Sequence, residues 1–186
     1  YLIEGNDIGG IDVGFLVKTA PVAPGVPRVE VVSVTQELDG SVLTNPDSST
    51  TVLHDRPPLM LRAIVHAANG GTYPVTVLEN HLRSLGSVDS TAAGSDGWAT
   101  EGDRVRAKRL AQAVDLASFV QGLQTADPAE RIIVMGDMNA FEVNDGYGHS
   151  LGTMSGVAFA DDSTVVPGDG TDLVTPDLLN LLSTAP

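Results

Sequence analysis

The feature that most constrains the fold of this chain is a short apolar run that ends in Gly-Asp-x-Asn. Residues 132–135 are Ile-Ile-Val-Met, and Gly136, Asp137 and Asn139 come directly after them. Isoleucine and valine suit a buried, pleated surface, so we predict a strand that ends near Gly136. If the chain stays extended for two more residues, Asp137 and Asn139 lie on one face, where the carboxylate accepts and the carboxamide donates hydrogen bonds. The same residues are also typical of a turn, so both interpretations stay open.

A second apolar run also ends in polar residues. Residues 73–78 predict a strand, and Asn80 and His81 follow it. A histidine at the end of a strand can donate to a phosphate oxygen or transfer a proton. In an α/β sheet, strand ends meet at the mouth of a crevice. We therefore predict that His81, Asp137 and Asn139 cluster at adjacent strand ends and point into a common crevice.

The remaining sequence predicts alternating strands and one long helix, without an internal repeat or a domain linker. The other expected strands are residues 11–17, 29–35 and 59–66, with a hairpin turn at residues 69–71. Apolar residues recur at helical spacing through residues 103–124, and Asp127-Pro128 ends that helix. The expected loops are residues 38–56, 86–102 and 143–172. The expected fold class is α/β, in a single domain over residues 1–186.

Five segments resemble the endonuclease/exonuclease/phosphatase superfamily, the deoxyribonuclease I-like hydrolases, and occur in that family's order. The Asn-His-Leu and Gly-Asp-x-Asn elements are the specific ones, and the others are supportive. The segments are Gly10-Ile11-Asp12-Val13-Gly14-Phe15-Leu16, Asp55-Arg56-Pro57-Pro58-Leu59, Asn80-His81-Leu82-Arg83-Ser84, Arg109-x-x-Gln112-Ala113 and Gly136-Asp137-x-Asn139-Ala140-Phe141-Glu142. The resemblance implies a four-layer α/β/β/α sandwich, here incomplete, and metal-dependent hydrolysis of a phosphodiester by water.

The resemblance also implies roles for individual residues. Asp137 would position or activate the attacking water, and Asn139 would hold that water or the phosphate oxygens. His81 would hydrogen-bond the phosphate and the charge that develops on it.

Three further residues are candidates for supporting roles. Arg56 and Asn80 would contact the substrate phosphate, Arg56 as a bidentate donor. Asp12 would orient His81 across the sheet, as a carboxylate fixes an imidazole tautomer.

Part of the family's catalytic set has no counterpart in this sequence. The family also uses an Asn on the first strand, a metal-holding Glu on the second, a further Asp, and a closing Ser-Asp-His. We therefore expect the chain to be an internal fragment, with the main metal ligand outside it and Asp137 as a candidate ligand. Mg²⁺ is the expected ion because hard oxygen ligands and phosphate suit it, with Mn²⁺ or Ca²⁺ as alternatives.

The charge balance limits how the chain can bind nucleic acid. The formal net charge is −14, from 10 basic and 24 acidic residues. Proteins that bind nucleic acid by counterion release present a basic face, so tight metal-free DNA binding is not expected. DNA or RNA is still an expected substrate, because bound divalent cations neutralise the local field. The basic residues at 104–109 are expected to form a solvated helix face.

Composition excludes several other classes. The chain has no cysteine, which excludes a disulfide framework and thiol nucleophiles. No apolar run is long enough to cross a bilayer, so no membrane span is expected. The acidic excess slightly favours an extracellular location, and no protein partner is inferred from the sequence.

Two alternatives to a nuclease-like enzyme stay open. The first is a phosphomonoesterase or lipid phosphodiesterase of the same fold, since substrate choice lies in loops that the sequence does not describe. The second is a non-catalytic relative, a binding or scaffold module that keeps the fold without the chemistry. An intact set of Asn, Glu and Ser-Asp-His in flanking sequence would favour the enzyme.

Overall fold

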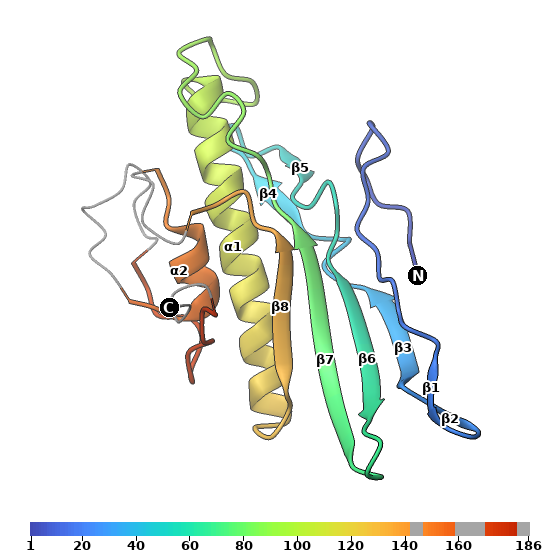
Figure 1. Ribbon diagram of the computed structural model, residues 1–186. Coiled ribbons are helices and arrows are strands. Elements are labelled where there is room, and N and C mark those ends of the chain that lie inside the picture. Colours follow the sequence, from blue (N-terminus) through green and yellow to red (C-terminus); the bar gives the residue numbers. More distant parts are fainter. Residues whose placement is uncertain (142–146, 159–169, 182–186) are drawn as a thin grey trace.

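A four-stranded mixed sheet forms the centre of the computed structural model, which describes residues 1–141, 147–158 and 170–181 (Figure 1). The strands are β3 (Val29–Gln36), β6 (Leu59–His66), β7 (Thr72–His81) and β8 (Ile132–Asp137), in the order β3-β6-β7-β8. The β3–β6 and β6–β7 pairs are antiparallel, whereas β7 and β8 are parallel. The predicted strands at residues 29–35, 59–66, 73–78 and 132–135 are therefore confirmed. The mixed α/β class is confirmed as well.

The predicted hairpin turn between β6 and β7 is also confirmed. Asn69 accepts a hydrogen bond from the Gly71 N–H through Oδ1, at 3.0 Å. Gly70 has a φ of +85°, a left-handed conformation that glycine adopts without steric cost.

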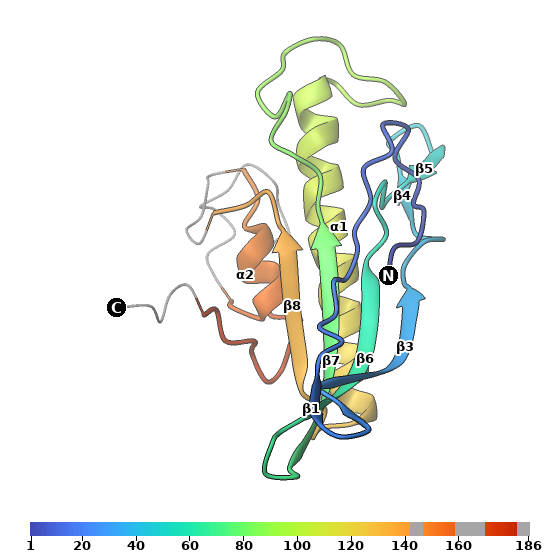
Figure 2. The ribbon, with the colours of Figure 1, turned by 45° about the vertical axis from the view of Figure 1, so that its right-hand side comes forward.

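The parallel pair requires a crossover, and helix α1 (Glu101–Ala126) provides it. The helix begins at the N-cap Thr100, whose hydroxyl and the Asp103 carboxylate form a capping box. It ends at Ala126, as the Asp127-Pro128 sequence predicts. Figure 2 shows the four strands side by side with α1 behind them.

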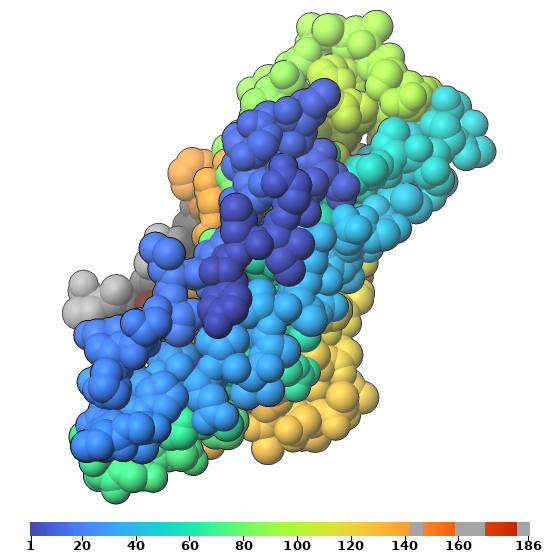
Figure 3. All heavy atoms as spheres, turned by 90° about the vertical axis from the view of Figure 1, so that its right-hand side faces the viewer, coloured from blue at the N-terminus to red at the C-terminus, as the bar shows by residue number. Residues whose placement is uncertain are grey.

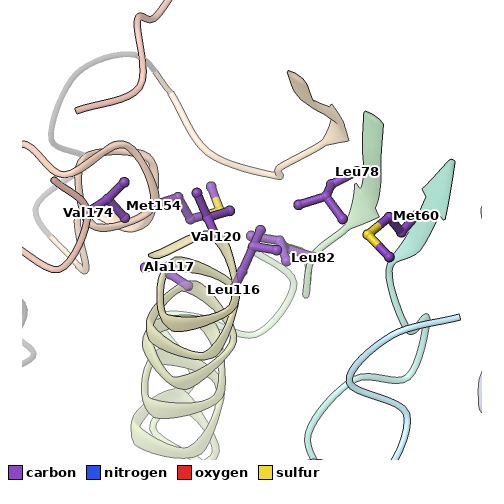
Figure 4. Close-up of a cluster of buried hydrophobic side chains, with 9 residues drawn as sticks. Met60, Leu78, Leu82, Leu116, Ala117, Val120, Met154 and Val174 are labelled. Carbon is purple, nitrogen blue, oxygen red and sulfur yellow. The ribbon is translucent and has the colours of Figure 1, made fainter. Parts of the chain in front are cut away.

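The main core lies between α1 and the sheet (Figure 4). Its largest fully buried members are Leu78 from β7 and Leu116 and Val120 from α1, each 0% exposed. The short helix α2 (Ser150–Ser155) packs beside α1 and adds Met154 to this core. The predicted loop at residues 143–172 therefore contains a helix, while residues 143–146 and 159–169 of it lie outside the described residues.

The opposite face of the sheet is partly covered by the N-terminal segment, residues 1–17 (Figure 3). Val13 and Phe15 are buried there in a second core cluster with Leu59 and Leu61 of β6. The predicted strand at residues 11–17 is wrong, because this stretch forms only an isolated bridge between Leu2 and Gly14. Residues 11–17 alternate in burial as a strand would, but the backbone bonds described for them run to Tyr1, beside the bridge between Leu2 and Gly14.

Two small hairpins complete the described architecture. One is β1 (Pro21–Ala23) with β2 (Val26–Pro27), and the other is β4 (Val42–Thr44) with β5 (Thr50–Val52). The β4–β5 hairpin lies in a stretch that the sequence predicts as loop, because its strands are too short for a clear alternation. Trp98 of the loop before α1 donates to Asn45 Oδ1 at 2.9 Å, which fastens that loop to the hairpin. Neither described helix combines the length and the apolar character that crossing a membrane requires.

Candidate functional site

His81 and Asp137 meet at the ends of two adjacent strands. They are the last residues of β7 and β8 and stand opposite each other in the parallel register. The distance from His81 Nε2 to Asp137 Oδ2 is 3.7 Å. Both side chains are open to solvent, with 24% of His81 and 64% of Asp137 exposed. The predicted pairing of these two residues at adjacent strand ends is therefore present in the structure.

Gly136 allows the two strand ends to approach. It stands opposite Asn80 in the register, with a φ of +125°. A Cβ atom at this position would lie 2.0 Å from the Asn80 carbonyl oxygen. A residue with a side chain would therefore force β8 away from β7 at the point where Asp137 faces His81.

Asn139 reaches the site through a turn. The strand ends at Asp137, and Asn139 has a φ of +46°, so strand alternation does not place its side chain. Its N–H donates to Asp137 Oδ1 at 2.9 Å, and its Nδ2 donates to the Leu82 carbonyl at 2.9 Å. Of the two interpretations of Gly-Asp-x-Asn, the turn is the observed one. Asn139 joins the ends of β7 and β8 and holds the Asp137 carboxylate.

Asn80 lies on the other side of the sheet from His81. Consecutive residues of a strand point to opposite faces, so only one of this pair can face the site. Asn80 is 1% exposed, and its Nδ2 donates to the carbonyls of Leu78 and Met135, at 3.1 and 3.3 Å. The predicted contact of Asn80 with a substrate phosphate does not fit this position. Its side chain instead links β7 to β8.

Arg56 approaches the site from the segment that precedes β6. Its side chain is 9% exposed, and its Nη1 lies 3.4 Å from Asp7 Oδ2. Within the described chain, its buried Nε atom has no hydrogen-bond partner. Asp7 is held in turn by the Gly9 N–H, which donates to Oδ1 at 2.7 Å. Asn6 fixes this loop by donating its backbone N–H to the Asp55 carbonyl at 2.8 Å.

Asp7, rather than Asp12, is the N-terminal carboxylate whose charge acts on His81. Asp12 Oδ1 accepts from the Gly5 N–H at 2.7 Å, so its carboxylate braces the N-terminal loop. The predicted role of Asp12 in orienting His81 has no supporting contact among the described residues. Sequence reasoning missed Asp7 because it lies outside the family-like segments and only the fold brings it to Arg56.

The surroundings of His81 favour its neutral form. Burial lowers the pKa of His81, and the positive charge of Arg56 lowers that pKa further. The carboxylates of Asp137 and Asp7 act in the opposite direction. The net lowering of the pKa leaves an imidazole that can accept a proton at one ring nitrogen and donate from the other.

Glu79 is a second acidic residue that sequence reasoning did not single out. It precedes His81 by two residues on β7 and therefore shares its face of the sheet. Burial raises the pKa of Glu79, while a hydrogen bond from the Gly14 backbone opposes that shift. Its Oε2 atom is buried and has no hydrogen-bond partner among the described residues. Residues 79 and 81 lie on the same face of a strand, so alternation along β7 is the sequence signal that could have identified Glu79.

The described residues do not provide a complete magnesium site. Among residues 1–141, 147–158 and 170–181, no group of three or more His, Asp or Glu side chains could hold a metal ion. Mg²⁺ needs near-octahedral oxygen ligation, usually through one or two carboxylates together with waters and substrate phosphates. Asp137 offers one exposed carboxylate, which suits one ligand of the metal. The described residues do not supply the other ligands.

An apolar hollow of about 500 Å³ lies away from the polar cluster, between β8 and α2. Its lining is mostly apolar and contains neither His81 nor Asp137. The lining residues are Ile132, Ile133, Val134, Met135, Gly136, Met138, Leu151, Met154, Ser155, Leu178, Leu179, Asn180 and Leu181. The hollow is therefore separate from the His81–Asp137 pair at the strand ends.

The basic residues of α1 do not form the solvated face that the sequence predicts. Lys108 and Arg109 are buried, at 7% and 2% exposure. Lys108 Nζ donates to both carboxylate oxygens of Asp55, at 2.9 and 2.8 Å, and Arg109 donates to the Arg83 carbonyl at 2.6 Å. The prediction is wrong for these two residues because their partners are distant in sequence. Arg104 and Arg106 pair with acidic residues of the first helical turn.

Comparisons with protein-family models, with curated proteins and with solved structures each gave no match for this chain.

Proposed function

We propose that this chain carries part of the active site of a nuclease-like phosphodiester hydrolase, in which water attacks a phosphate held near His81, Asp137 and Arg56. The observation that supports this proposal most is the pairing of His81 with Asp137, 3.7 Å apart at two strand ends and open to solvent. Arg56 lies close enough for its charge to act on His81. An imidazole, a carboxylate and a guanidinium together suit phosphoryl transfer from a diester to water.

Each group has a distinct task in this proposal. The Asp137 carboxylate would orient the attacking water by accepting a hydrogen bond from it. His81 would hydrogen-bond a phosphate oxygen, and Arg56 would offset the charge that grows on the phosphate in the transition state. Asn139 would act through Asp137, because its N–H holds one oxygen of that carboxylate at 2.9 Å.

Mg²⁺ is the proposed cofactor, with Mn²⁺ or Ca²⁺ as alternatives. The ion would supply positive charge next to the phosphate. Asp137 is its candidate ligand in this chain, and the described residues do not complete the set. The roles given above to His81, Asp137 and Arg56 do not depend on the position of the ion.

We also propose the four-layer sandwich as the complete architecture. The N-terminal segment covers the site face of the sheet over β6, but Ile133 and Met135 of β8 are each 48% exposed on that face. An apolar strand surface of this kind is normally packed against another layer. A second sheet over this face would bury both side chains and would enclose the strand ends that carry the site.

One observation favours a non-catalytic relative as the second candidate. Among the described residues, no group of three or more His, Asp or Glu side chains could hold a metal ion. A binding module of this fold would use Arg56 and His81 to hold a phosphate group without turning it over. DNA or RNA as substrate, and an extracellular location, are part of the enzymatic proposal and share its test.

The deciding experiment is a hydrolysis assay on the gene-encoded protein that contains this chain. Plasmid nicking and release of p-nitrophenol from bis(p-nitrophenyl) phosphate would be measured with Mg²⁺ or Mn²⁺. Metal-dependent turnover that is lost in both His81→Ala and Asp137→Asn supports the enzyme. Phosphate binding at His81 without any turnover would favour the binding module and reject the hydrolase.

A further inference from the structure

Gln112 of α1 connects the two chain segments that carry the proposed phosphate-binding residues. It is 2% exposed, on the helix face that packs against the sheet and its loops. Its Oε1 accepts the Arg83 N–H at 2.8 Å, and its Nε2 donates to the Leu53 carbonyl at 2.8 Å. Both partners are backbone groups, so the single carboxamide fixes the main chain of both segments.

The two segments are those that lead out of β7 and into β6. Arg83 follows His81 by two residues, and Leu53 precedes Arg56 by three. The two segments extend from the paired strands β6 and β7, beyond the Leu59–Glu79 pair at this end of the sheet. The distance between their backbones therefore affects the distance between the His81 imidazole and the Arg56 guanidinium, together with the β6–β7 pairing.

Other side chains of α1 also hold these segments, and the hydrogen bonds described for three of them are as follows. Arg109 donates to the Arg83 carbonyl at 2.6 Å. Lys108 binds Asp55, and Asp115 Oδ2 lies 3.0 Å from His54 Nε2. In the hydrogen bonds described for this helix face, Gln112 bonds to both segments, to Arg83 in one and to Leu53 in the other.

We propose that Gln112 is a positioning residue, whose carboxamide sets the placement of Arg56 relative to His81. This inference rests on the proposed function, in which those two side chains hold the phosphate. Gln112 touches neither the phosphate nor the attacking water. Its contribution comes from the two backbone groups that it holds, the buried Leu53 carbonyl and the partly buried Arg83 N–H.

The carboxamide can be removed with little change of volume by Gln112→Met. The variant leaves the Leu53 carbonyl and the Arg83 N–H without this partner, so the two segments lose the side chain that connects them. A misplacement of about 1 Å in an active site can cost on the order of 10²-fold in rate. We expect Gln112→Met to lower kcat/KM by at least about tenfold, with part of the loss in kcat.

Gln121→Met is the matched control. Gln121 is a glutamine of the same helix and also bridges it to another segment, accepting the Thr175 N–H at 2.6 Å through Oε1. Its Nε2 lies 3.4 Å from the Thr175 carbonyl. This contact lies on the C-terminal segment, which carries none of the proposed site residues. Gln121→Met should lower the melting temperature without a comparable loss of kcat/KM.

A double-mutant cycle with Arg56→Ala separates positioning from general destabilisation. If Gln112 acts through Arg56, its substitution should cost less than about threefold once Arg56 is gone, because residues that act as a unit are not additive. Equal losses in the Arg56→Ala and wild-type backgrounds would overturn the proposal. So would equal losses of kcat/KM in Gln112→Met and Gln121→Met.

A readout without substrate keeps the inference apart from the proposed function. The Arg56 Nε–Hε and His81 ring resonances would be recorded by NMR in both methionine variants. Shifts at both side chains in Gln112→Met, and at neither in Gln121→Met, support positioning even if no variant and no wild-type protein hydrolyses a phosphodiester. In that case the hydrolase proposal fails by itself. Resonances in Gln112→Met that match the wild type would overturn the positioning role.

Discussion

His81 Nε2 stands 3.7 Å from Asp137 Oδ2 because two parallel strands end at the same edge of the sheet. The helix α1 that joins these strands also holds the segments on which His81 and Arg56 lie. The crossover helix is thus both the connection and the support of the site.

Substitution of His81 or Asp137 should abolish most of the activity. In the gene-encoded protein that contains this chain, His81→Ala and Asp137→Asn should each lower kcat/KM by roughly 10²- to 10⁴-fold, the range typical of positioned acid–base groups. His66→Ala is the matched control, because His66 pairs with Glu30 at 3.1 Å at the opposite end of β6. A similar loss in all three variants would show that the effect is on folding and not on chemistry.

The 186-residue chain by itself should hydrolyse phosphodiesters poorly, even with Mg²⁺ or Mn²⁺ supplied. Asp137 alone provides too few fixed ligands for a metal that dehydrates reluctantly. Where the gene encodes residues on either side, the longer protein should be faster by orders of magnitude if those residues complete the set. Plasmid nicking by both proteins, measured side by side, tests this. Robust metal-dependent turnover by the 186 residues alone would show that the site is built differently.

The pKa of His81 should respond in opposite directions to its two charged neighbours in the loops. Arg56→Ala removes a positive charge that lowers the pKa, so the pKa of His81 should rise. Asp7→Asn removes a negative charge that raises it, so the pKa of His81 should fall. NMR titration of the His81 ring protons measures both shifts. Shifts of the same sign would contradict the charge arrangement described here.

His54 should make the folded chain less stable in mild acid. It is 1% exposed, and burial lowers its pKa below the ordinary 6.5, against the opposing effect of Asp115. Below pH 6.5 the unfolded chain binds a proton that the folded chain does not, so this contribution to stability is complete above pH 6.5 and is lost as the pH falls.

The test compares the pH dependence of urea unfolding in the wild type and in His54→Gln between pH 7 and pH 5. The variant starts from a lower stability because it loses the bond to Asp115, but its free energy of unfolding should fall less steeply with acid. Glu79, whose pKa is raised, acts in the opposite direction at the acid end, so the comparison between the two proteins is decisive. Parallel curves would rule out a titrating His54.

Two glycine substitutions should have opposite effects on stability. Gly136→Ala should destabilise the fold by at least about 2 kcal/mol, because its Cβ would lie 2.0 Å from the Asn80 carbonyl at a φ of +125°. Gly122→Ala should stabilise it by about 0.5–1 kcal/mol, since Gly122 lies within α1 with open space around its Cβ position. Urea denaturation measures both, and a neutral Gly136→Ala would mean that β7 and β8 approach less closely than described.

The sheet and the His81–Asp137 pair could be predicted from sequence because their signals are local. Residues 59–66 contain an apolar run between turn residues, and they form β6 with the same bounds. Asn80 could also have been placed correctly, because alternation along β7 cannot direct both Asn80 and His81 to one face. Glu79 follows from the same alternation.

Other parts of the site depend on contacts that no local pattern contains. Lys108 is buried because Asp55 accepts from it, and Asp7 belongs to the site because Arg56 lies beside it. The left-handed Asn139 donates a hydrogen bond to Leu82, which lies just beyond the end of β7. Motif residues mark where a strand ends, but they do not specify which distant segment packs there.

The position of β8 at the edge of the sheet links ligand binding to folding. Among the described strands, β8 is hydrogen-bonded to β7 alone, so Asp137 lies on a strand that is held from one side. A ligand that engages His81 and Asp137 together also fastens this edge and adds RT ln(1 + [L]/Kd) to the stability of the folded state. The melting temperature of this protein thus reports how fully the site is occupied, with no need for turnover. A phosphate analogue that shifts the His81 resonances should therefore also raise Tm, and both effects should be lost in His81→Ala if it binds at the strand ends.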